Sequence, residues 1–107
     1  MRYDAFQKRL VDAVLNAPGD TTETQRRAVL GQARETPGAG NLSPALIHYV
    51  DTVARHAYKV TDADVTALQR AGQSDDSLFE ITVAAAVGAA LHRLDRGMAA
   101  LRGEESD

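Results

Sequence analysis

The sequence predicts an all-α protein: a single-domain bundle of about five helices that ends in a long C-terminal helix. Apolar residues recur at intervals of three and four along most of the chain, as on one face of a helix. Capping residues, glycine and proline separate these segments, and none shows the strict alternation of a β-strand. The chain has 107 residues, the usual size of one domain. We expect residues 1–102 to form this domain and residues 103–107 to be an acidic disordered tail.

Two helices are predicted before the central loop, over about residues 3–16 and 23–35. The first carries a stripe with helical spacing, which consists of Tyr3, Phe6, Leu10 and Val14. The turn "APGD" ends this helix, because proline and glycine continue a helix poorly. One of three residues caps the second helix: Asp20, Thr21 or Thr22. Of these, Thr22 together with Gln25 fits a capping box.

The stretch "TPGAGNLSP", residues 36–44, is the expected connecting loop. Ser43 as N-cap and Pro44 at the first helical position predict the start of a third helix. Its apolar face consists of Leu46, Tyr49, Val50, Val53 and Ala57. Thr61 or Asp62 caps a short fourth helix, and Gly72 ends it, in the position after a helix that glycine prefers.

The last helix is predicted over residues 75–101, about 40 Å at 1.5 Å per residue. Ser74 caps it. Between residues 81 and 91 it is apolar on every side, so we expect neighbouring helices to surround it. Small residues four apart (Ala84 with Gly88, and Ala85 with Ala89) indicate a closely approaching helix. A coiled-coil-like seam is predicted at Val87, Leu91, Leu94, Met98 and Leu101.

Composition excludes several classes of function. The net charge of −3 comes without a basic patch, so no nucleic acid partner is expected. The N-terminus has no apolar leader and no run approaches 18 apolar residues, so we expect a cytoplasmic protein without membrane contact. Cysteine is absent, which excludes disulfides, thiolate catalysis and thiol-ligated metals within these residues. We expect neither a metal nor a cofactor, because His48 and His56 lie about 12 Å apart along a helix.

Six polar residues are candidates for a site. Glu80, His56 and His92 are the catalytic candidates, as general acids or bases, and Arg93, Arg55 and Tyr58 are the ligand-binding candidates. Glu80 stands where the last helix becomes buried, so its pKa could be raised. Alternatively, it accepts hydrogen bonds at the helix start or pairs with an arginine of a neighbouring helix. His92 could equally be a surface or subunit-contact histidine, and the polar end of an amphipathic helix accounts for His56 and Tyr58.

Residues 49–98, "YVDTVARHAYKVTDADVTALQRAGQSDDSLFEITVAAAVGAALHRLDRGM", carry a family resemblance. With the flanking residues from about 46 to 101 they resemble the alkylhydroperoxidase D-like and carboxymuconolactone decarboxylase superfamily, most of all its peroxidase-related branch. The matching features are a short helix, a glycine, a capped restart and a long helix, with Arg93 where the family often has arginine. The resemblance implies an alkylhydroperoxidase D-like all-α fold, usually assembled as a homodimer, trimer or hexamer.

The chain departs from the peroxidase members of this superfamily at their catalytic motif. That motif, a CxxC pair with a nearby histidine and a glutamate relay, should fall in or near "TTETQRRAVLGQAR", which has neither cysteine nor histidine. Thiol peroxidase activity is therefore not expected. Decarboxylase-type members use acid–base groups instead, which leaves two hypotheses. The protein binds or transforms a small organic acid or lactone, or it is a non-catalytic, homo-oligomerising structural or regulatory module.

Overall fold

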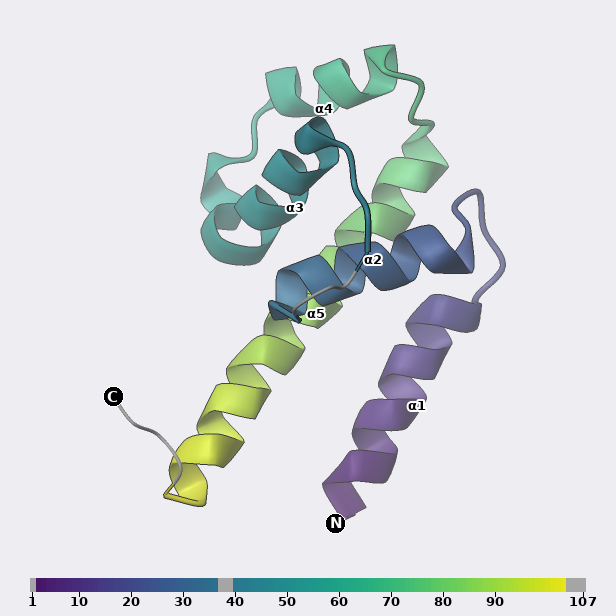
Figure 1. Cartoon of the computed structure of the whole chain (residues 1–107). Helices are drawn as coiled ribbons and strands as arrows, with labels where there is room; N and C mark the ends of the chain where they lie inside the picture. The colour runs from purple at the N-terminus through teal and green to yellow at the C-terminus, as the bar shows by residue number, and fades with distance from the viewer. Residues whose placement is uncertain (1, 37–39, 104–107) are drawn as a thin grey trace.

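The computed structural model describes residues 2–36 and 40–103, which form helices and connections with no strand among them (Figure 1). The helices are α1 (Arg2–Asn16), α2 (Glu23–Arg34), α3 (Pro44–His56), α4 (Asp62–Arg70) and α5 (Asp75–Leu101), with a 3-10 turn, η1 (Ala57–Lys59), after α3. The predicted all-α fold class and the long C-terminal helix are confirmed. The predicted tail lies outside the described residues apart from residue 103, and so do residues 37–39 of the predicted loop.

Local capping chemistry explains where the helices begin. Thr22, Ser43 and Ser74 each accept a hydrogen bond from the backbone N–H three residues later, at 3.0, 3.3 and 3.0 Å. Thr61 and Asp64 form a reciprocal capping box at the start of α4. Helix α2 stops at Arg34, one residue before its expected end. Helix α3 stops at His56, so Ala57, expected on the apolar face of that helix, begins η1 instead and is exposed.

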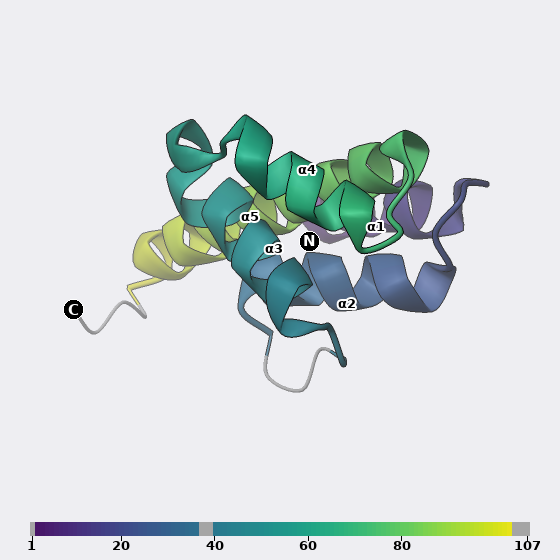
Figure 2. The same ribbon diagram turned by 90° about the horizontal axis from the view of Figure 1, so that it is seen from above.

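The contact between α2 and α5 lies at the centre of the fold. In Figure 1, α2 crosses in front of the middle of α5, and Figure 2 shows the same pair from above. A Cβ atom on Gly88 would overlap the carbonyl oxygen of Leu30 and lie 2.8 Å from the Cβ atom of Ala33. The close approach expected at Gly88 is therefore made, and its partner is a helix of the same chain.

The middle of α5 is covered on one side and open on the other. Its buried residues include Ile81, Ala84, Ala85, Gly88, Ala89 and Leu91. The expectation that neighbours surround this segment is wrong for the single chain, because Val83, Ala86 and Ala90 are exposed. The predicted seam is divided in the same way. Leu91 is 2% exposed, whereas Leu94 and Leu101 are 39% and 81% exposed.

By length and composition, α5 meets the criteria for a helix that could cross a membrane. Of its most apolar window, 44% is buried inside the protein. The core helix of a water-soluble protein meets the same criteria, so this finding is weak support for a membrane span.

The role of Gly88 can be tested against a second glycine of the same helix. Gly88→Ala should lower the free energy of unfolding by about 2 kcal/mol, because the added methyl group forces α2 away from α5. Gly97→Ala should raise it by up to about 1 kcal/mol, because alanine is the better helix former and, within the single chain, no atom lies within 4 Å of the added Cβ. Urea unfolding followed by circular dichroism measures both. Equal effects of the two substitutions would contradict the close contact.

Candidate functional site

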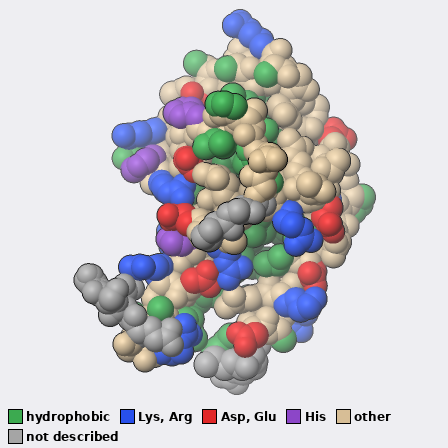
Figure 3. Space-filling view, in the orientation of Figure 1, with side chains coloured by type: hydrophobic (Ala, Val, Ile, Leu, Met, Phe, Trp, Pro, Cys, Tyr) green, Lys and Arg blue, Asp and Glu red, His purple; other side chains and the backbone are tan. Residues whose placement is uncertain are grey.

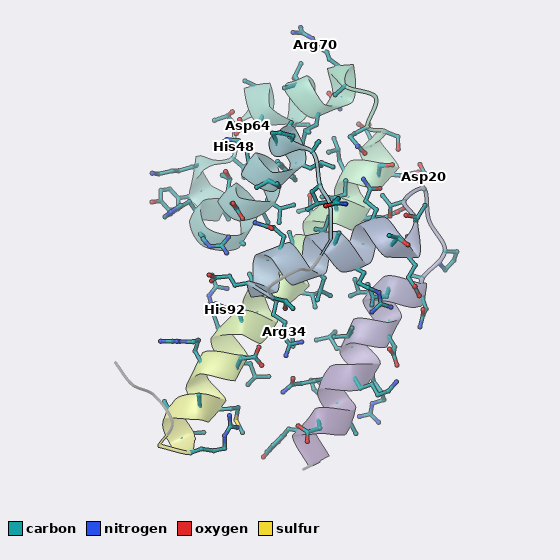
Figure 4. All side chains as sticks on the ribbon, in the orientation of Figure 1. Asp20, Arg34, His48, Asp64, Arg70 and His92 are labelled. Carbon is teal, nitrogen blue, oxygen red and sulfur yellow. The ribbon has the colours of Figure 1, made fainter. Side chains whose placement is uncertain are left out.

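The C-terminal end of α2, the last turns of α3 and the middle of α5 surround a hollow of about 230 Å³, which we call the Glu35 hollow. Its lining consists of Ala33, Glu35, Ala54, Arg55, Ala89, His92 and Arg93. Figure 3 shows histidine, acidic and basic side chains gathered on this side of the molecule, and Figure 4 labels His92 beside the end of α2. Three predicted site residues therefore meet here: Arg55, His92 and Arg93. Glu35, which the sequence reasoning missed, lies with them.

Glu35 holds a backbone conformation that glutamate rarely adopts. It follows α2 with φ 65° and ψ 39°, and among the described residues it alone combines a side chain with a positive φ. Glycine or asparagine usually fills this position after a helix, since a Cβ atom there costs about 1–2 kcal/mol. A negative charge also opposes the dipole at this helix end. A glutamate just before "TPG" was therefore a signal that the sequence reasoning could have used.

His92 links Glu35 to the end of α2. Its Nδ1 lies 3.1 Å from the carbonyl oxygen of Arg34, and its Nε2 lies 2.9 Å from a carboxylate oxygen of Glu35. Both partners are hydrogen-bond acceptors, and the ring joins them through its two nitrogens. The ring is 35% exposed, which leaves it accessible from solvent.

Two arginines complete the hollow. Arg55 lies 3.5 Å from the carboxylate of Glu35 and donates to Asp51 at 2.9 Å. Asp51 also accepts from the side chain of Gln32, so α2 and α3 are joined twice. Arg93 donates to the carbonyl oxygen of Ala54 at 3.2 Å, near the C-terminal end of α3. The hollow thus has positive charge on two sides and one carboxylate, Glu35, in its lining.

Glu80 belongs to a different place, the junction between α1 and α2. Its carboxylate accepts from Oγ1 of Thr21 at 2.5 Å and from the backbone N–H groups of Thr21 and Asp20 at 2.8 and 2.9 Å. Arg26 lies 3.6 Å away. These donors, above all the Thr21 hydroxyl, lower the pKa of Glu80. A raised pKa, one of the two possibilities for Glu80, is therefore wrong, and the alternative of a carboxylate that accepts hydrogen bonds beside an arginine of a neighbouring helix is confirmed.

Arg26 is the buried centre of this junction. It is 6% exposed and donates at 2.8 Å to the carbonyl oxygens of both Leu15 and Ala17, at the end of α1. Its other terminal nitrogen donates to Thr21, at 2.6 Å to the carbonyl oxygen and 3.0 Å to the hydroxyl. Arg26 therefore satisfies carbonyl groups that the end of a helix leaves without partners. The sequence reasoning did not single it out.

His56 and Tyr58 lie apart from the Glu35 hollow. Their rings meet edge to face with centroids 6.1 Å apart, and Tyr58 is 81% exposed. Lys59 approaches the Tyr58 ring at 5.8 Å, so these residues form a surface cluster at the end of α3. No group of three or more metal-ligating side chains of histidine or acidic type occurs among the residues that the structure describes.

The role of Glu80 predicts a pH-dependent loss of stability. Glu80→Gln should lower the free energy of unfolding at pH 7 by about 1–3 kcal/mol, because the amide cannot accept from every donor that faces it. The pKa of Glu80 is below its ordinary value of 4.5 in the folded protein. The carboxylate therefore stabilises the fold above pH 4.5, and this contribution disappears as the pH falls through the folded-state pKa.

Urea unfolding of the wild type and Glu80→Gln between pH 7 and pH 3 tests this prediction, and the difference between them should shrink below pH 4.5. Glu23→Gln is the matched control, because the exposed Glu23 pairs only across one helix turn, with Arg27 at 3.5 Å. Its effect should stay below about 0.5 kcal/mol. A difference for Glu80→Gln that does not change with pH would contradict the assignment.

Comparison with known proteins identifies no relative of this chain. The chain matches no protein-family model, no curated protein and no solved structure. The function must therefore be argued from the site itself.

Proposed function

We propose that the protein is a cysteine-free relative of the alkylhydroperoxidase D-like and carboxymuconolactone decarboxylase superfamily, and that it binds a small organic acid or lactone in the Glu35 hollow. The observation that carries the proposal is the convergence of Arg55, Arg93 and His92 on a hollow that contains one strained glutamate. The helix order of the fold and the absence of cysteine support a relative without thiol chemistry.

The lining of the hollow suits a short, negatively charged ligand. Two guanidinium groups can bind a carboxylate, for which arginine has a matching geometry. The methyl groups of Ala33, Ala54 and Ala89 provide an apolar wall for a short carbon chain. The volume of about 230 Å³ is below the roughly 300 Å³ at which pockets for drug-sized ligands begin. A small metabolite fits these limits better than a polymer or a nucleotide.

His92 and Glu35 supply the acid–base groups of this proposal. The contact between Nδ1 of His92 and the Arg34 carbonyl oxygen fixes the ring orientation and leaves Nε2 for proton exchange. Glu35, at 2.9 Å from Nε2, can take up or return that proton. A ligand carboxylate held by Arg93 and Arg55 would lie next to this pair, where a proton could be moved to or from the ligand.

The rival hypothesis is a non-catalytic structural or regulatory module. Each cationic side chain of the hollow has a partner within the protein: Arg55 contacts Asp51 and Glu35, Arg93 contacts the Ala54 carbonyl oxygen, and His92 contacts the Arg34 carbonyl oxygen. On this hypothesis the cluster only joins the ends of α2 and α3 to α5. The two hypotheses differ in whether an added anion perturbs His92.

Proton NMR of the three histidine rings can decide between them. With succinate as the probe, we expect the Hε1 signal of His92 to move and to saturate, because the added carboxylate binds beside the ring. His48 and His56, on the exposed side of α3, serve as internal references. Succinamide, the uncharged analogue, should cause no shift.

Two arginine variants complete that experiment. Arg93→Gln should weaken succinate binding at least tenfold, whereas Arg70→Gln on α4 should leave it unchanged, because Arg70 lies outside the hollow (Figure 4). A His92 signal that stays fixed in succinate, with Arg93→Gln altering only the melting temperature, would favour the structural module.

Glu35 offers a test that separates stability from binding. Glu35→Gly relieves about 1 kcal/mol of backbone strain and loses two partly exposed ion pairs, each worth about 0–1 kcal/mol. Its free energy of unfolding should therefore stay within about 1 kcal/mol of the wild type, while the response of His92 to succinate changes. Glu35→Ala keeps the strain and should be about 1 kcal/mol less stable than Glu35→Gly in urea unfolding. Equal stability of the two variants would show that the strain is not real.

A further inference from the structure

One face of α5 is apolar and exposed along most of its length. This face, which we call the apolar stripe, consists of Phe79, Val83, Ala86, Ala90, Leu94, Gly97 and Leu101, all of them exposed. The large members are well exposed: Phe79 by 70%, Leu94 by 39% and Leu101 by 81%. At 100° per residue the stripe covers about 80° of the helix circumference and about 33 Å of its length. Its centre lies on the far side of α5 from Gly88 and α2.

The surface of the single chain is large for its mass. It measures 6825 Å² for 11.5 kDa, against roughly 5,800 Å² from the scaling for monomeric proteins. The difference of about 1,000 Å² is close to the roughly 800 Å² per partner that a standard interface buries. A partner on the apolar stripe would cover part of this excess.

We infer that this partner is a second copy of the chain, packed antiparallel through α5 across a two-fold axis at Ala90. This arrangement places Val83 opposite Gly97 of the other copy and Ala86 opposite Leu94, so at these two positions a larger side chain meets a smaller one. The two Ala90 residues face each other on the axis, where small side chains permit a close approach. Between Val83 and Gly97 the order of residues along the stripe is therefore complementary to its own reverse, as a two-fold interface requires.

The acidic start of α5 and the helix dipole favour the antiparallel orientation. The first turn carries Asp75 and Asp76, and the last turn carries no basic residue. Antiparallel packing separates the acidic first turns of the two copies, and it pairs opposite ends of the two helix dipoles. Parallel packing would bring the two acidic turns and like dipole ends together.

A groove beside Phe79 receives the end of the partner helix in this arrangement. The groove, about 340 Å³ in volume, is lined mainly by apolar side chains of α1 and α5, among them Ala13, Val14, Phe79 and Val83. Leu101 is the most exposed leucine of α5 and lies at the opposite end of the stripe. The two-fold axis brings Leu101 of the second copy next to Phe79 and the groove. Contact between Leu101 of one copy and the groove of the other would bury both of these exposed apolar surfaces.

Cysteine cross-linking provides the sharpest test, because the chain has no cysteine of its own. Ala90→Cys should form a disulfide with its own copy under mild oxidation. Val83→Cys mixed with Gly97→Cys should give mainly the mixed cross-link, at least tenfold over either self-link. Dominant self-links at both positions would indicate parallel helices and overturn the proposal. Absence of any cross-link would overturn it as well.

The oligomeric state is an independent readout. Sedimentation equilibrium of the wild type should give twice the mass of 11.5 kDa. Ala90→Glu should give a monomer with unchanged helix content, because two charges would face each other on the axis. Ala67→Glu, at an exposed position of α4, is the matched control and should remain a dimer. A wild-type monomer that sediments with phosphatidylcholine vesicles would overturn the proposal in favour of a membrane surface. Val83→Glu also places a charge on the apolar stripe, at a position outside the lining of the Glu35 hollow. Succinate binding should persist in this variant, so the two proposals fail separately.

Discussion

The packing of α2 against α5 over the missing side chain of Gly88 is the constraint on which the other features depend. The two helices run in the same direction along their contact. Thr21, before α2, meets Glu80, the Leu30 carbonyl meets Gly88, and the Arg34 carbonyl meets His92. The side chain of Arg34 adds a two-pronged ion pair with Asp95 at 2.9 Å, which raises the pKa of Arg34. The packing of α2 against α5 therefore positions both the Glu80 junction and the Glu35 hollow.

The two clusters contain glutamates of contrasting character. Glu80 is bound mainly by backbone N–H groups and one hydroxyl, and Gly19 leaves room for its carboxylate because a Cβ atom there would overlap it. Such donors cannot give up a proton, so they hold Glu80 in its charged form. Glu35 is bound by the side chains of His92 and Arg55, which can exchange a proton or turn toward a ligand. The chemistry of the donors therefore distinguishes the two carboxylates: backbone and hydroxyl groups hold Glu80, whereas a histidine and an arginine contact Glu35.

Much of the fold could be predicted because its signals are local. Ser43 with Pro44, Thr61 and Ser74 start helices through bonds that span three residues, and the small residues around Gly88 indicated a close helix. The site depends on contacts between distant residues, such as His92 with Arg34, 58 positions apart. Sequence spacing placed Glu80 and His92 on one helix but could not show that each is bound to a different end of α2. It also could not show the left-handed backbone of Glu35, which arises from the way α2 ends.

The conformation of Glu35 has a consequence for reading related sequences. The backbone at this position would accept glycine with less strain, so within the fold only the ion pairs with His92 and Arg55 favour a carboxylate there. Among homologues, glycine or asparagine at this position would mark chains that keep only the architecture. Glutamate, especially where it varies together with the histidine and arginine that it contacts, would mark chains under selection for chemistry. A single position at the end of α2 could thus divide a lineage into scaffolds and binders.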